Sequence, residues 1–423
     1  MPVAELPHSD SRFRSLRHRN FRLFWSGQIV SLIGTWMQSV AQAWLLHRLT
    51  DSPMMLGLLG FAQFAPVTLF SLWAGVVADR FDKRKLLLLT QIFAMTQSVT
   101  LAVLASSGRA EPWMVLALAF LFGIYNALDL PVRQSILVEM VGRRDLPNAI
   151  ALNSAGFNVA RILGPAIAGV LLVSVGEAGC FWINAVSYLP VIVSLFRVRL
   201  PERETNAAAT LGSLREGLRY TLETTSIRNL LILLAICGGL GFQYNTLLPV
   251  YARSIFHSDA GVYGALMSSF GVGSLIAALS MTRALDRWSL RRNLLIGLVG
   301  AGAGLAAFAW SRWLPLTLAM GLLTGYGLIL YVASTNTLIQ MTTEDRYRGR
   351  VMSLYTFMFI GTTPLGALMA GGIAERFGAP VASSVCALLL LGGALWVSAR
   401  LRFLREQEAA KARAAVPAPE EMG

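Results

Sequence analysis

Charged side chains are scarce in this sequence. Only 14% of its 423 residues are Asp, Glu, Lys or Arg, whereas a soluble domain usually carries roughly a quarter. Hydrophobic residues make up 55% of the chain, and the mean hydropathy is +0.57. We therefore expect this chain to fold in an apolar solvent rather than in water.

Residues with reactive chemistry are also few. The three cysteines, Cys180, Cys237 and Cys386, fall singly in separate apolar stretches, and the four histidines are scattered, so no metal-ligand spacing is present. The sequence has no glycine-rich phosphate loop and no Ser/His/Asp arrangement. We expect no metal, no cofactor and no enzymatic activity. The first twenty residues are polar and basic without an apolar run, so no cleavable signal peptide is predicted.

Long apolar segments recur along the whole chain. A bilayer core of about 30 Å requires roughly 20 apolar residues per helix. Because lipid offers no hydrogen bonds to the backbone, such segments must form helices. The sequence thus predicts an all-α integral membrane protein with twelve transmembrane helices, near residues 23–47, 54–78, 86–106, 112–132, 150–175, 179–196, 229–250, 262–282, 293–311, 314–338, 352–374 and 380–400.

The distribution of basic residues predicts the orientation. The net charge of +13 would suggest nucleic-acid binding in a soluble protein. Here, however, 30 of the 36 Lys and Arg lie in the two tails and in the loops after the even-numbered helices, and five lie in the opposite loops. This positive-inside pattern predicts a multi-pass protein of the inner (cytoplasmic) membrane with both termini cytoplasmic, and no nucleic-acid partner.

The longest loop divides six helices from six. We expect a cytoplasmic tail at 1–22, an N-terminal bundle at 23–197, a cytoplasmic linker at 198–228, a C-terminal bundle at 229–400 and a tail at 401–423. The tail lacks apolar content and is predicted to be disordered. Within the linker, leucines at helical spacing predict a short helix on the membrane surface: Leu211, Leu214, Leu218 and Leu222.

An internal repeat links the two halves. Residues 75–85 align with residues 282–292 at a shift of 207 residues, with an Asp-Arg pair followed by clustered bases in both copies. The first copy resembles the loop 2–3 signature of the major facilitator superfamily at Gly75, Asp79, Arg80, Lys83 and Arg84. Asp82 replaces the second glycine of the signature, and we expect it to tolerate a left-handed backbone.

The resemblance covers about residues 1–400 and implies two pseudo-symmetric six-helix bundles. Stretches at 17–25, 31–38 and 129–134 are similar to the branch that contains the enterobactin exporter and macrolide efflux proteins. The resemblance also implies a conformational latch that holds the cytoplasmic side shut. In this latch Asp79 would meet the helix that begins near Val351, Lys83 would pair with Asp129, and Asp286 and Arg287 would form the second copy. Alternatively, these charges only anchor the topology.

Polar residues inside the spans are candidates for a substrate cavity. The first predicted helix carries a stripe at steps of three and four residues, which lines either a water-filled cavity or a contact between helices: Gln28, Ser31, Thr35, Gln38 and Gln42. Arg161 is the sole basic residue well inside a span, where it is costly unless it faces a cavity or a partner. Further candidates are Asn126, Asn158, Gln243, Tyr244, Asn245, Tyr326 and Tyr331.

Two features bear on the direction and coupling of transport. Gly164, Pro165 and Gly169 resemble an antiporter signature of the superfamily, which favours export. No Asp or Glu lies in the middle third of a predicted span, so protons as coupling ion are expected from the resemblance alone. A lone arginine suits an anionic or strongly polar substrate.

The sequence therefore favours a monomeric secondary transporter that contacts membrane lipid and exports a small amphipathic or anionic molecule, such as a drug-like compound or a siderophore, by alternating access. The alternatives are a metabolite uptake transporter, a non-transporting membrane sensor, and a lipid flippase, which a lipid-facing slit between the halves would favour.

Overall fold

The computed structural model describes residues 13–198, 212–281 and 287–414. All regular secondary structure in these ranges is helical. Twelve segments are long and apolar enough to cross a membrane, and each overlaps one of the predicted spans. The all-α, twelve-span architecture predicted from the sequence is confirmed.

The first six spans belong to five elements that follow the short 3-10 helix η1 (Arg14–Arg17). They are α1 (Arg19–Thr50), α2 (Pro53–Arg80), α3 (Lys83–Ser106), α4 (Pro112–Ser174) and α5 (Gly176–Arg197). α4 contains two spans because its backbone breaks at Gly142, whose φ of 72° is a conformation that glycine adopts without steric cost. At the start of α2, the Ser52 side chain accepts a hydrogen bond from the backbone N–H of Met55 and so caps the helix.

The last six spans are less regular. Span seven consists of α7 (Thr225–Leu233), the π-helix η2 (Leu234–Leu240), the 3-10 turn η3 (Gly241–Gln243), α8 (Tyr244–Val250) and the π-helix η4 (Tyr251–Ile255). Span eleven is divided into α12 (Arg348–Gly361) and α13 (Thr363–Phe377). The other spans are α9 (Ala260–Ser280), α10 (Arg287–Trp310), α11 (Leu314–Thr342) and the first part of α14 (Ala379–Ala414).

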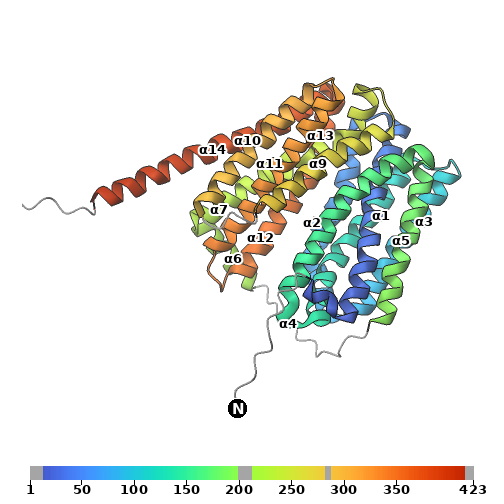
Figure 1. Ribbon diagram of the computed structural model, residues 1–423, viewed down its shortest axis with the longest axis horizontal. Coiled ribbons are helices and arrows are strands. Elements are labelled where there is room, and N and C mark those ends of the chain that lie inside the picture. The colour runs from blue at the N-terminus through green and yellow to red at the C-terminus, as the bar shows by residue number, and fades with distance from the viewer. Residues whose placement is uncertain (1–12, 199–211, 282–286, 415–423) are drawn as a thin grey trace, which may run out of the picture.

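The spans form two bundles that lie side by side (Figure 1). In the first, α1 packs on α4 and α5, α3 packs on α5, and α2 packs on α4; in the second, α10 packs on α11 and α14, and α9 packs on α11. Two seams join the bundles, one between α4 and α9 and one between α2 and α13. We call the end of the molecule where α1 begins the Arg19 end, and the end where α1 passes into α2 the Asp51 end. The bundles converge at the Asp51 end and diverge towards the Arg19 end (Figure 1).

The predicted linker helix is present as α6 (Gly212–Glu223). It is fixed to α12 at the Arg19 end, because Arg350 donates to the Glu216 carboxylate at 2.7 Å and the ring of Tyr220 stacks on that of Tyr347 with centroids 4.2 Å apart. Residues 199–211 lie outside the described ranges, so the expected boundaries of the bundles and linker stay predictions.

The turn after α2 does not use the left-handed backbone that Asp82 was expected to tolerate. The φ of Asp82 is −58°, and its carboxylate accepts a hydrogen bond from the Lys85 N–H and caps α3. The expectation about the C-terminal tail is wrong. The tail expected to be disordered from residue 401 continues α14 as a helix to Ala414. Its Ala, Glu, Gln, Lys and Arg residues are strong helix formers, so it needs no apolar face to remain helical. Residues 415–423 of that tail lie outside the described ranges.

Candidate functional site

Close backbone contacts form both seams between the bundles. In the α4–α9 seam, a Cβ placed on Gly264 would lie 2.6 Å from the Cα of Gly169. In the α2–α13 seam, a Cβ placed on Gly371 would lie 2.8 Å from the Cα of Gly57. Gly57 and Gly264 are separated by the same 207 residues as the two Asp-Arg motifs. The internal repeat thus places one glycine pair in each seam, where only the absence of a side chain lets the helices meet.

Polar and aromatic contacts also join the two bundles at the Asp51 end. The ring of Trp44 on α1 stacks on that of Tyr263 on α9, with centroids 6.0 Å apart. Arg253 pairs with Asp51 at 3.1 Å. The Glu375 carboxylate on α13 accepts hydrogen bonds from the Ser52 hydroxyl and the Met54 N–H, at 2.9 and 3.0 Å, at the beginning of α2.

The Arg19 end has a different character. The ribbons of the two bundles lie close together at the Asp51 end and further apart at the Arg19 end (Figure 1). The Asp51 end is also where Arg253 of the second bundle donates to the backbone carbonyl of His47 of the first.

Arg161 lies on α4 where this helix faces the other bundle. The preceding and following turns pack closely on α1, because a Cβ on Gly164 would lie 2.4 Å from the Trp36 Cβ. This contact places the Arg161 guanidinium over the Trp36 ring, 5.9 Å from its centroid. The next residue, Ile162, contacts Gly271 of α9 in the opposite bundle.

Arg161 is half-buried, and within the described ranges it makes no ion pair. It is also close enough to Tyr244 of the other bundle for an electrostatic interaction. Burying a guanidinium at this position in a membrane costs free energy. Here the face of the Trp36 indole ring offsets part of that cost. The arrangement can therefore attract an anionic or strongly polar group into the space between the bundles.

In the second bundle, spans seven and eleven are interrupted at the same depth. The backbone changes from α to π geometry at Leu234, and α12 ends at Gly361, one residue before Thr362. The Thr362 hydroxyl lies within hydrogen-bond distance of two backbone carbonyls, that of Met358 in its own span at 2.8 Å and that of Ala235 in span seven at 3.2 Å, and so links the two interruptions. Discontinuous helices that meet near the middle of a membrane protein are a typical feature of transporter binding sites.

Aromatic rings pack together beside the two interruptions. Phe242 packs edge-on against Phe359, with centroids 5.7 Å apart, and Tyr355 stacks on Phe359 at 6.5 Å. Sequence reasoning missed this part of the site. The signals that could have identified it are the glycines at 238, 239 and 241 and the sequence Gly-Thr-Thr-Pro at 361–364, because both interrupt otherwise apolar spans.

The polar stripe of α1 does not line a cavity, which corrects the first of the two readings of that pattern. Gln28, Ser31, Gln38 and Gln42 are each at most 2% exposed. The Gln38 side chain donates to Gln97 at 2.9 Å and accepts from Ser98 and Asn184, at 2.6 and 2.8 Å. Gln42 donates to the backbone carbonyl of Val115. The stripe joins α1 to α3, α4 and α5, because the same helical face that could meet water meets three other helices here.

Thr35, in the same stripe, is half-buried and shares a hydrogen bond of 3.2 Å with the Tyr188 hydroxyl.

The other expected cavity residues divide into two groups. Gln243, Tyr244 and Tyr331 are buried, which is a correction: Gln243 donates to the carbonyl of Gly239, Tyr331 donates to the carbonyl of Leu233, and Tyr244 stacks on Phe270. Those that remain half-buried are Asn126, Asn158, Asn245 and Tyr326.

The expected ion pair between Lys83 and Asp129 is absent. Lys83 instead pairs with Glu139 at 2.6 Å. Asp129 is buried and accepts hydrogen bonds from Arg133, Thr90 and Gln91. The reason is depth, because ten helical residues separate Asp129 from Glu139, or about 15 Å along the helix axis.

The rest of the proposed latch is only partly visible. Arg84 donates to the backbone carbonyls of Leu195 and Phe196, at the end of α5. The remaining latch residues have side chains outside the described part of the chain: Gly75, Asp79, Arg80, Asp286 and Arg287. The latch therefore stays a prediction.

Comparison with known proteins identifies the family. Residues 10–422 match the family described as transmembrane secretion effectors. The chain is a member of the major facilitator superfamily. It is a multi-pass membrane transporter of small molecules, and not an enzyme.

Several transporters of this superfamily resemble the chain over most of its length. The staphyloferrin A transporter of Staphylococcus aureus is 27% identical over 84% of this chain and 90% of its own. The multidrug efflux pump Tap of Mycolicibacterium fortuitum is 25% identical over 88% of this chain and 93% of its own. Among solved structures, a bacterial homologue of the lysosomal transporter Spinster has a TM-score of 0.72 at 15% identity, over 90% of this chain and 96% of its own. The transporter PepTSo has a TM-score of 0.74 at 12% identity, over 92% and 99%.

Proposed function

We propose that this transporter exports a small anionic or amphipathic molecule, of the drug-like or siderophore type, by alternating access between the two bundles. It works as a monomer with both termini in the cytoplasm. The structure then corresponds to an inward-facing state, in which the Asp51 end is external and closed. The orientation is supported by the thirty Lys and Arg on the side of the tails against five on the opposite side.

The observation that carries the proposal is the position of Arg161. It is half-buried between the bundles, rests on Trp36 and has no carboxylate partner in the described ranges. Placing an arginine at the centre of a transmembrane helix costs about 2.5–3.5 kcal/mol even on the lenient insertion scale. An anionic substrate that accepts hydrogen bonds from the guanidinium would offset this cost while it is bound.

The relatives support a small-molecule cargo of this class, because one is a staphyloferrin A transporter and another is a multidrug efflux pump. The helix-breaking residues Gly164 and Pro165 lie beside Arg161 and support export through their resemblance to the antiporter signature. Proton exchange is part of the proposal. Asp129, the buried carboxylate of the first bundle, is already held by Arg133 and two further donors, so we assign it to the bundle's structure.

Counterflow of candidate anions in proteoliposomes, with and without a pH gradient, tests the proposal. Arg161→Gln should lower the transport rate at least about tenfold without lowering the amount of protein in the membrane, since a charge-assisted hydrogen bond is worth about 1.5–3 kcal/mol. Arg109→Gln, on an external loop, is the matched control and should leave transport unchanged. Equal rates for wild type and Arg161→Gln would reject the role of Arg161, and uptake driven only from the Asp51 side would reject export.

A further inference from the structure

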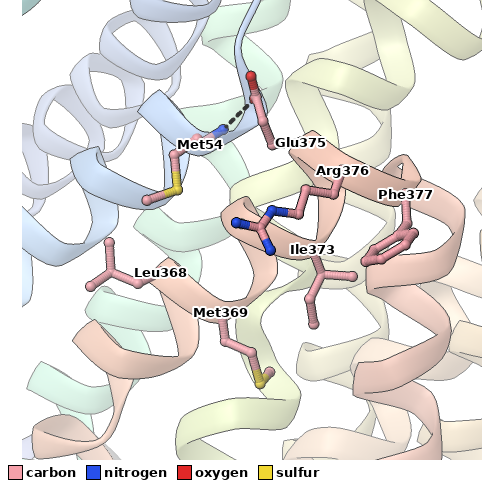
Figure 2. A pocket seen from close by; sticks show the side chains of 8 residues that line it. Met54, Leu368, Met369, Ile373, Glu375, Arg376 and Phe377 are labelled. Atoms are coloured by element: carbon pink, nitrogen blue, oxygen red, sulfur yellow. Dashed lines mark hydrogen bonds between the residues drawn. The ribbon is translucent and has the colours of Figure 1, made fainter.

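A cavity lies on the flank of the α2–α13 seam. Its volume is about 480 Å³. It is lined by Met54 of α2 and by one face of α13, including Leu368, Met369, Ile373 and Arg376. Figure 2 shows the Arg376 guanidinium above the side chains of Met369 and Ile373, with Met54 and Leu368 on the other side of the cavity.

The cavity is polar at one end and apolar at the other. Arg376 lies in the last turn of α13, at the Asp51 end, and Leu368 lies eight residues deeper, or about 12 Å along the helix axis. Below the cavity, Leu365 of the same helix is 61% accessible, which is the character of a surface that faces hydrocarbon. The cavity thus extends from the depth of lipid headgroups to the depth of acyl chains.

The charge at its mouth is not neutralised within the protein. Arg376 makes no hydrogen bond or ion pair with another described residue. The neighbouring Glu375 also lines the cavity, and its carboxylate accepts hydrogen bonds from the Ser52 hydroxyl and from the Met54 N–H, of which Figure 2 shows the second. The positive end of the α2 helix dipole offsets that negative charge, so the guanidinium of Arg376 is left to attract an anion.

We propose that this cavity binds an anionic phospholipid of the outer leaflet, with the phosphate on Arg376 and the acyl chains against Met54, Leu368 and Met369. The assignment to the outer leaflet rests on the proposed orientation, whereas the binding itself does not depend on transport. Since α2 and α13 belong to different bundles, the lipid bridges them only while the Asp51 end is closed, and its binding stabilises that state.

Photocrosslinking of the full-length protein tests the site. The probe is phosphatidylglycerol with a photoreactive group in its acyl chain, compared with phosphatidylcholine that carries the same chain, and the modified peptides are identified by mass spectrometry. We expect crosslinks concentrated on Met54 and residues 368–373, with phosphatidylglycerol favoured at least about threefold. Equal labelling by the two lipids, or labelling spread evenly over all lipid-facing helices, would overturn the proposal.

Two variants separate the charge from the cavity. Arg376→Gln should remove the preference for phosphatidylglycerol at this site, whereas the control Arg109→Gln should retain it. Gly372→Leu keeps Arg376 but fills the cavity, because a Cβ at Gly372 already lies 3.8 Å from the Met54 sulfur, and it should reduce labelling by both lipids. Each variant is first checked for a single monodisperse peak in detergent.

Two results contradict this arrangement. Unchanged labelling in Gly372→Leu would show that the cavity holds no acyl chain. Displacement of the lipid by excess inorganic phosphate would show that the site binds a free anion. Failure of transport in the proteoliposome assay would leave the binding result unaffected, so the two proposals can fail independently.

Discussion

The polar residues of α1 illustrate what residue spacing can and cannot predict. The steps of three and four residues correctly place Gln38 and Gln42 on one face of a helix. Spacing does not reveal what that face meets, and it meets Gln97, Ser98 and Asn184 of neighbouring helices. The partner of Lys83 was predicted wrongly for a similar reason. Which carboxylate of α4 lies next to Lys83 depends on how α3 packs on α4, and residue spacing does not reveal that.

Gln38→Leu tests this interpretation at the residue scale. The substitution leaves the Ser98 hydroxyl donor and the Gln97 acceptor without a partner, whereas Asn184 keeps its bond to Ser98. A buried unsatisfied polar group costs about 1–3 kcal/mol. We expect a lower thermal unfolding temperature in detergent and an unchanged substrate KM. Ser39→Ala is the control, because the Ser39 hydroxyl bonds only to the carbonyl of Thr35 in its own helix. Normal stability combined with a raised KM would restore the cavity reading.

The ion pair at the closed end is expected to matter little. Asp51 is 68% exposed and Arg253 is 36% exposed, and exposed pairs are worth at most about 1 kcal/mol, or about fivefold in an equilibrium. Asp51→Asn should therefore change the transport rate by less than about fivefold in the proteoliposome assay. A complete loss of transport in protein that is normally inserted would show that this pair controls closure.

At the scale of elements, we expect the two seams to contribute more to closure of the Asp51 end than the ion pair between Asp51 and Arg253 does. The backbones of α4 and α9 meet at Gly169 and Gly264, where no side chain fits. The sequence grouped Gly164 and Gly169 in one signature, but it did not distinguish Gly164, which meets α1, from Gly169, which meets the other bundle. The interruptions of spans seven and eleven were missed because apolar composition predicts that a helix crosses the membrane and not that it is continuous.

Gly264→Leu should prevent the Asp51 end from closing. Overpacking of a tight contact costs about 1–3 kcal/mol, which is enough to shift a balanced equilibrium roughly tenfold towards the outward-open state. The distance between spin labels on the Asp51 ends of α4 and α9 should increase. Gly392→Leu on α14 is the control, because a Cβ there meets nothing within 4 Å. An unchanged distance in Gly264→Leu would mean that the seam tolerates a side chain.

At the scale of the whole molecule, the sequence predicted most of the fold. The twelve spans and their order follow from apolar length, because the bilayer imposes the length and the helical form of each span. Their division into two bundles follows from the internal repeat. The conformation could not be predicted in this way, since the same helices pack in either state of an alternating-access cycle. It follows instead from contacts between residues distant in sequence, such as Trp44 with Tyr263.

The central claim is that the bundles must separate at the Asp51 end during transport, and a reversible crosslink tests it most directly. A Cβ on Gly261 of α9 lies 3.9 Å from a methyl carbon of Val173 on α4, so Val173→Cys with Gly261→Cys can form a disulfide. The native cysteines are buried and should not interfere. We predict that oxidation of the double variant stops transport and that reduction restores it, with neither single variant affected. Full transport by the oxidised, crosslinked protein would contradict the account.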